Sequence, residues 1–518
     1  MATPTRMRLP RFLVGAVLLA AAQFAGAQSA PPQAQSAQPA PTAQKAPNKI
    51  NPEIQSIIDG AANAPPEFGA DILIRLAESN KLAGPSAKID LLTKAFNLAA
   101  GAEQPVKRAA GLGVFDAHSA LLARAYRMNI DRLSLQSRAV ADLAPLNAAK
   151  ARQLFDQIQF PALAPVSCEE RLSYDVDLYY EALGKTVVAT PAGKDKNRTV
   201  VFLSPFVSSF QSHAQLKPAA ALLVALRLSP PDLAQLANTF AGSLAQLHGD
   251  ERSFANAVTG PGGARATAAI ADLIGALDEK QLSGSGLLRA YRQYLVTNFS
   301  DVRCASARPQ SDQDGLPPAI RGFNQQFRAE LLALQIAPVS AEELKSARIV
   351  APPQSTPYWQ TQQAKKLMAE LRALRSGGDE TSESGNDSEK RAPVSAQVTD
   401  FLAEIDSWQP QDEPVADVFH EKSILYDGAL DLAPAAQRSQ IINSFVGFLQ
   451  QYSSQLPTRL EWILPADDWL SGRKGGDDRK EVIQAFLNSG DPVLTLYARL
   501  ERLEPRKVNE TESEGYKK

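Results

Sequence analysis

The chain has 518 residues, of which 44% are hydrophobic and 21% are charged, and its formal net charge at pH 7 is −2. This balance gives no basic surface for nucleic acid or an anionic membrane, so we expect no nucleic-acid partner. Leu and Ala dominate, and long alternating runs of β-branched residues are almost absent, which favours an all-α fold.

The first 27 residues have the pattern of a secretory signal peptide. Three arginines between positions 6 and 11 precede the apolar run FLVGAVLLAAAQFAGA, and a small-x-small cleavage site ends at Ala27. The run is too short to favour a permanent anchor. We therefore expect cleavage after Ala27, no membrane span afterwards, and export to the periplasm or the cell exterior.

Residues 28–48 are mostly Pro, Ala and Gln with hardly any charge. A segment of this composition cannot bury enough apolar surface to fold, and it is predicted to be a disordered linker. We expect the main helical domain to follow at residues 49–375.

Amphipathic helical periodicity recurs through this domain. In the segment 229–249, Ser229 is suited to cap a helix, Pro230 to open it and Gly249 to end it. Its apolar stripe consists of Leu233, Leu236, Ala237, Phe240, Leu244 and Leu247. Many such segments, joined by short Pro- or Gly-marked turns and without a fixed repeat length, predict helix pairs packed as an irregular α-superhelix or arch.

The segment 167–183, SCEERLSYDVDLYYEAL, combines carboxylates with tyrosines. Read as one helix, it places Asp177 and Glu181 one turn apart, and its buried side consists of Leu172, Val176, Tyr179 and Leu183. Tyr174, Asp177, Tyr180 and Glu181 form a candidate binding patch, because paired acids beside aromatics occur at sugar-cleaving sites. The alternative is a solvated acidic face with tyrosines at its edge.

Residues 186–203, TVVATPAGKDKNRTVVFL, interrupt the helical pattern. Two β-branched runs flank a polar turn, which allows one short β-hairpin here.

Cys168 and Cys304 are the only cysteines and lie 136 positions apart. Both are placed near expected helix ends, and export would expose them to oxidising conditions with no competing third thiol. We therefore predict a Cys168–Cys304 disulfide with Cα atoms within about 7 Å of each other.

Residues 376–393, SGGDETSESGNDSEKRAP, are polar and Gly-rich and are predicted to be a second disordered linker. A C-terminal helical region is expected at 394–505, and the tail 506–518 is expected to be disordered. The sequence leaves open whether 376–393 separates two domains or is a loop inside one.

The dipeptide His420-Glu421 begins a zinc-protease motif, but the position of the second histidine is occupied by Ile424. The other three histidines are scattered along the chain, so the sequence shows no local set of metal ligands. We expect no metal and no other cofactor.

These features favour an exported, non-catalytic helical scaffold that binds a protein or peptide partner. A helical-toroid enzyme acting on polysaccharide is the alternative, and it would need carboxylates and tryptophans gathered at one opening. The sequence does not identify the partner or the oligomeric state.

Overall fold

The structure is a computed structural model, and it describes thirteen stretches of the chain. They are residues 51–82, 84–102, 108–110, 117–158, 162–170, 172–190, 198–259, 263–305, 315–344, 346–351, 361–379, 387–472 and 477–505. The expected signal peptide, the linker 28–48 and the tail 506–518 lie outside the described residues.

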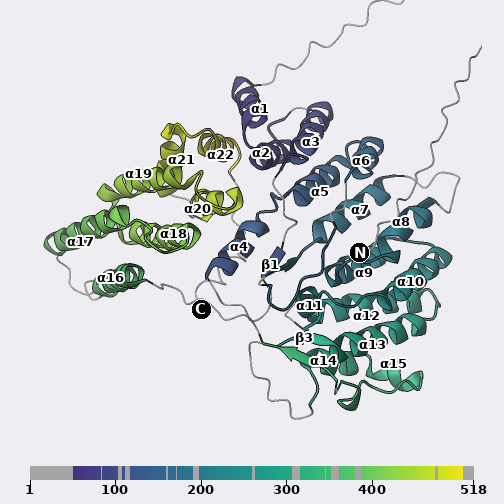
Figure 1. Ribbon diagram of the computed structural model, residues 1–518. Coiled ribbons are helices and arrows are strands. Elements are labelled where there is room, and N and C mark those ends of the chain that lie inside the picture. The colour runs from purple at the N-terminus through teal and green to yellow at the C-terminus, as the bar shows by residue number, and fades with distance from the viewer. Residues whose placement is uncertain are drawn as a thin grey trace, which may run out of the picture. The chain divides into compact units, whose positions relative to one another are not determined.

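Most of the described chain is helical, which confirms the all-α prediction (Figure 1). The helices of the N-terminal part are α1 (Pro52–Asn63), α2 (Pro66–Glu78), α3 (Pro85–Ala99), α4 (Ala117–Arg127), α5 (Arg132–Leu143), α6 (Ala148–Phe155), α7 (Asp177–Ala189), α8 (Arg198–Ser208), α9 (Leu216–Ala225) and α10 (Pro230–Leu244). They continue with α11 (Glu251–Phe254), α12 (Gly263–Glu279), α13 (Ser285–Ser300), α14 (Pro318–Gln326) and α15 (Arg328–Ala333). Short 3₁₀ or π segments are η1 (His213–Gln215), η2 (Ala255–Thr259) and η3 (Glu342–Leu344).

The C-terminal helices are α16 (Gln362–Asp379), α17 (Asp387–Ser407), α18 (Val415–Leu432), α19 (Ala435–Tyr452), α20 (Arg459–Gly472), α21 (Asp477–Asn488) and α22 (Pro492–Leu503).

Local capping fixes where many helices begin. The Ser229 side chain accepts a hydrogen bond from the Asp232 amide at 3.4 Å, and α10 begins at Pro230 as predicted. Asp491 caps α22 in the same way through the amides of Val493 and Leu494. Helix α10 ends at Leu244, earlier than expected, and Gly249 follows with a positive φ of 74°. The side chains of Ser229 and Asp491 thus supply acceptors for amides that the first helical turn leaves unpaired.

The helices of the N-terminal part pack in two layers. Helices α3, α5, α7, α9, α12 and α14 contact one another in succession. In the second layer, α6 packs on α5 and α7, while α10 packs on α8, α9, α12 and α13 (Figure 1). The amphipathic helices thereby bury their apolar stripes against neighbouring helices, as the helix-pair prediction expects.

The predicted β-hairpin at 186–203 is wrong. Helix α7 runs through Ala189 and α8 begins at Arg198, and residues 191–197 lie outside the described part. In α8, Val200, Leu203 and Val207 are buried at helical spacing, so packing overrides the β-preference of the branched side chains.

Short strands occur elsewhere. Strand β1 (Arg108–Ala110) pairs antiparallel with β2 (Leu172–Tyr174), with Ala109 opposite Ser173. Strand β3 (Val302–Cys304) pairs in parallel with β4 (Arg348–Val350).

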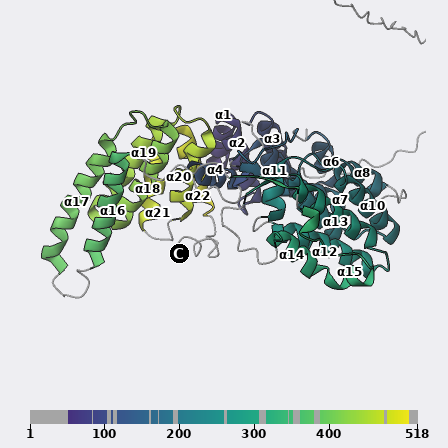
Figure 2. The ribbon, with the colours of Figure 1, turned by 60° about the horizontal axis from the view of Figure 1, so that its bottom comes forward.

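Helices α16 to α22 pack with one another (Figure 2). Helix α16 packs on α17 and α18, and α16 and α17 extend into the predicted linker 376–393 from its two sides. Residues 380–386 between them lie outside the described part. Helices α16 and α17, which flank these residues, contact each other.

Helix α22 also packs on α1 and α2 through a buried network of charges. Glu501 is fully buried and accepts hydrogen bonds from Arg75 and, at 2.8 Å, from Arg479. One turn earlier on α22, the Tyr497 hydroxyl donates to Asp71 at 3.1 Å. Asp71 also pairs with Arg138 of α5 at 2.8 Å, so the network runs from α22 through α2 to α5.

Candidate functional site

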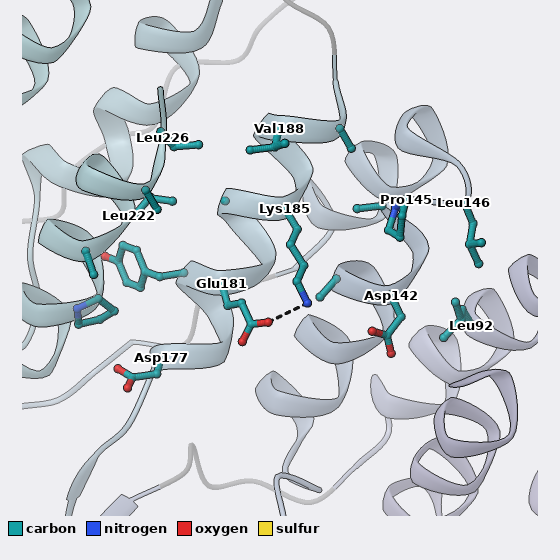
Figure 3. Close-up of a pocket in the computed structure, with 18 of the residues that line it drawn as sticks. Leu92, Asp142, Pro145, Leu146, Asp177, Glu181, Lys185, Val188, Leu222 and Leu226 are labelled. Atoms are coloured by element: carbon teal, nitrogen blue, oxygen red, sulfur yellow. Dashed lines mark ion pairs between the residues drawn. The ribbon is translucent and has the colours of Figure 1, made fainter. Parts of the chain in front are cut away.

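An open groove of about 1000 Å³ crosses the face formed by α2, α3, α5, α7 and α9. Figure 3 shows α7, which carries Lys185 and Val188, running through the middle of the groove. On one side of α7 lie Leu222 and Leu226, and on the other side lie Asp142, Pro145, Leu146 and Leu92. This volume is at the upper end of the range for small-molecule pockets, about 300–1,000 Å³.

The floor of the groove is mainly apolar. Leu92, Tyr180 and Leu222 are buried residues that line it, while Val188 is 74% exposed. Gly184 allows α7 to approach α9 closely, because a Cβ there would lie 2.9 Å from Leu222 Cδ1. An exposed valine beside an apolar floor leaves surface that a ligand could cover favourably.

Charged side chains surround this floor. Two of the lysines are paired along or across helices: Lys185 lies 2.7 Å from Glu181 within α7, and Lys217 of α9 pairs with Asp177 of α7. The third, Lys88, donates to the backbone carbonyl of Ser79 at 2.9 Å. Each lysine of the groove therefore already has a partner.

Glu78 of α2 and Asp142 at the end of α5 form a carboxyl pair in the groove wall. Glu78 is partly exposed and Asp142 is half-buried, and their carboxyl groups are close enough to form a hydrogen bond when one of them holds a proton. Loss of water around the carboxyl, and then the nearby Asp142, raise the pKa of Glu78 to about 7 although Arg138 opposes the shift. Desolvation also raises the pKa of Asp142.

Replacing Glu78 by glutamine is expected to stabilise the protein increasingly as pH rises. Because the pKa of Glu78 is raised, the folded state keeps a proton that the unfolded chain releases above about pH 4.5. The wild type therefore loses stability relative to the Glu78→Gln variant as pH rises from about 4.5 to about 7. The difference in thermal midpoint between Glu78→Gln and the wild type should therefore grow between about pH 5 and pH 8. The double variant Glu78→Gln/Asp142→Asn is the control. If the difference in thermal midpoint between Glu78→Gln and the wild type stays constant with pH, the shared proton is contradicted.

The structure brings together three of the four residues of the predicted patch. Asp177, Tyr180 and Glu181 line the groove, whereas Tyr174 does not. Tyr174 is buried and its hydroxyl donates to the carbonyl of Ala164 at 2.9 Å. That the patch binds a ligand stays a prediction.

The helix expected across 167–183 begins later than predicted. Residues Leu172–Tyr174 form β2, and α7 starts at Asp177. The expected buried side is nevertheless correct, because Leu172, Val176, Tyr179 and Leu183 are all buried. Tyr180 is buried as well, and its hydroxyl donates to the carbonyl of Phe206 and accepts from Gln215, each at 3.1 Å.

Sequence reasoning missed the wall of the groove that α2, α3 and α5 form. Glu78 and Asp142 each lie at the end of a helix, and neither stands out in the sequence. One available signal was Asp142, an acid within the last turn of a helix, where a negative charge is unfavourable.

The tryptophans do not form a sugar-binding platform in the described residues. Trp408, Trp462 and Trp469 are each at most 5% exposed, and Trp462 donates to the carbonyl of Leu449 at 2.7 Å. Trp359 lies outside the described part.

His420 lies in the core, where its Nε2 is 3.4 Å from Oε2 of the buried Glu461. His213 is also buried, between the Tyr294 hydroxyl and the carbonyl of Gly249, each at 2.6 Å. Among the residues with described positions, no three His, Cys, Asp or Glu side chains gather as metal ligands.

EDTA is therefore expected to leave the thermal unfolding midpoint unchanged, because the described part of the chain holds no ligand cluster that would couple metal binding to folding. Thermal melts with and without the chelator test this. A clear fall in the midpoint would show a metal site outside the described residues.

The predicted disulfide is present: Cys168 and Cys304 are bonded, with Cα atoms 5.1 Å apart. Cys304 ends β3 just after the end of α13, as expected near a helix end, whereas Cys168 precedes β2 and not a helix. The loop carrying Cys168 is also held by α11, because Arg252 donates to the carbonyl of Cys168 and the Val166 amide donates to Asp250 at 2.8 Å.

Across the thirteen described stretches, no helix combines the length and apolarity that crossing a membrane requires. No protein-family model matches the chain, and neither a curated protein nor a solved structure is significantly similar to it.

Proposed function

We propose that this chain is an exported helical binding protein whose groove holds a peptide segment of a partner protein. The observation that carries this proposal is the open, mainly apolar groove across α3, α5, α7 and α9, with charged side chains around its floor. The N-terminal signal pattern and the Cys168–Cys304 disulfide support export.

The size of the groove favours a peptide. Packed helices lie about 8–10 Å apart, so four neighbouring helices cover roughly 24–30 Å. An extended chain advances about 3.3 Å per residue, so about eight residues would fit across them. An apolar floor with a polar margin suits a segment that buries one face and keeps the other in water.

A variant that introduces a charged side chain into the apolar floor of the groove tests the proposal. Val188 is exposed in the groove, so Val188→Asp should preserve the fold while making the floor unfavourable for apolar side chains. Val201 on α8 is a matched control, since it is 71% exposed and does not line the groove.

Peptides would be selected on the wild-type protein from a random phage-displayed library and then synthesised. Their affinities, measured by fluorescence anisotropy, should fall by about tenfold or more with Val188→Asp and stay unchanged with Val201→Asp. Equal binding to the wild type and Val188→Asp, or no selected peptide at all, would overturn the proposal.

A further inference from the structure

We infer that the groove selects peptides carrying a basic side chain, whose cationic group binds between the carboxyl groups of Glu78 and Asp142. This inference rests on the proposed function and names the chemistry of the ligand that the groove takes.

The first argument is the balance of charge within the groove. Its carboxylates are Glu78, Asp142, Asp177 and Glu181, and its cations are Lys88, Lys185 and Lys217. Asp177 and Glu181 are neutralised by Lys217 and Lys185. Among the described residues, no lysine or arginine forms an ion pair with Glu78 or Asp142, and Lys185 and Arg138 act on them only at longer range.

The two cations that act on the pair, Lys185 and Arg138, are both already engaged. Lys185, whose charge acts more strongly on Asp142, pairs with Glu181 at 2.7 Å. Arg138, one turn before Asp142 on α5, pairs with Asp71 at 2.8 Å and donates to the carbonyl of Asn129 at 3.3 Å. It therefore acts on the carboxyl pair only at longer range. If this guanidinium turned to the carboxyl pair, it would break its ion pair with the buried Asp71, which the network that reaches Tyr497 holds in place.

The second argument is the position of Glu78 and Asp142 within the groove. The pair lies in the groove wall beside the apolar floor, with Leu92 and Leu146 lining the same side. A lysine or arginine side chain suits this arrangement, because its methylene stem covers apolar surface while its charged end reaches the carboxyl groups. Arginine can also donate to two carboxyl oxygens at once.

Binding of a cation should release the proton that the pair shares. The other ionisable groups facing the pair are Asp71 on α2, Arg138 on α5, Glu181 and Lys185 on α7, and Lys88 on α3. Since the pKa of Glu78 is about 7, the free pair carries less negative charge at pH 6 than at pH 8. Affinity for a basic peptide should therefore fall by about tenfold between pH 8 and pH 6, because one proton must leave on binding.

The experiment uses the tightest peptide from the library selection, made in a second form with ε-acetyl-lysine or citrulline in place of its basic residues. At about pH 8, the wild type should bind the neutral form about tenfold or more weakly, and Glu78→Gln/Asp142→Asn should bind both forms alike. The double variant should also lose the fall in affinity between about pH 8 and pH 6. Circular dichroism of the double variant checks that it remains folded.

The possible failures can be told apart. If Val188→Asp abolishes binding but the neutral peptide binds as tightly as the basic one, the groove binds peptides and the inference about charge is wrong. If basic peptides bind equally well to Val188→Asp and to the wild type, both the inference and the proposed function fail.

Discussion

Replacing Glu501 by alanine is expected to lower the free energy of unfolding by about 3–5 kcal/mol. Glu501 is fully buried, and the change leaves Arg75 and Arg479 facing each other without the carboxylate that compensates them. Uncompensated charge at a largely buried position is costly because water replaces the lost partner only in part. Urea or thermal unfolding followed by circular dichroism would measure the loss.

The matched control is Glu53→Ala. Glu53 of α1 pairs with Arg502 on the same helix α22, but both side chains are exposed to solvent. Water and salt screen such a pair, so this variant should cost less than about 1 kcal/mol. Equal losses for Glu501→Ala and Glu53→Ala would show that the buried network does not stabilise the contact between α22 and the N-terminal helices.

Reduction of the Cys168–Cys304 disulfide is expected to cost about 2–5 kcal/mol of stability. The bond closes a loop of 136 residues that contains helices α7 to α13. In the loop-entropy model, a closure of this length restricts the unfolded chain by about 5 kcal/mol, which is an upper value. The thermal midpoint should therefore fall clearly when a phosphine reductant is added.

The Cys168→Ser/Cys304→Ser variant is the control for this measurement, because its midpoint should be low from the start and insensitive to the reductant. The unreduced wild type should expose no thiol when it is unfolded in denaturant. Two titratable thiols in that state would contradict the disulfide.

The two largest effects differ in how far the sequence could anticipate them. The disulfide could be predicted from the sequence, because two cysteines in a chain that is expected to be exported allow one intramolecular pairing. Glu501 and Arg75 are 426 positions apart, and nothing local marks either of them as buried. Their contact depends on α22 packing against α2, which only the folded chain establishes.

The same distinction holds for the groove. Asp177, Tyr180 and Glu181 stood out because acids and aromatics are close in sequence, and all three line it. Glu78 and Asp142 become neighbours only because α2 packs on α5. The raised pKa values of these two carboxyl groups follow from that contact, since desolvation and a nearby carboxyl both arise from packing.

The sequence by itself determined the features governed by local physics. Helical periodicity predicted the all-α class, and Ser229 with Pro230 located the start of α10, because a cap and its helix are adjacent in the chain. It failed at 186–203, where branched side chains suggested strands. Only the tertiary structure decided that Val200, Leu203 and Val207 bury their side chains from a helix, because burial against neighbouring helices outweighs an intrinsic preference of under about 1 kcal/mol per residue.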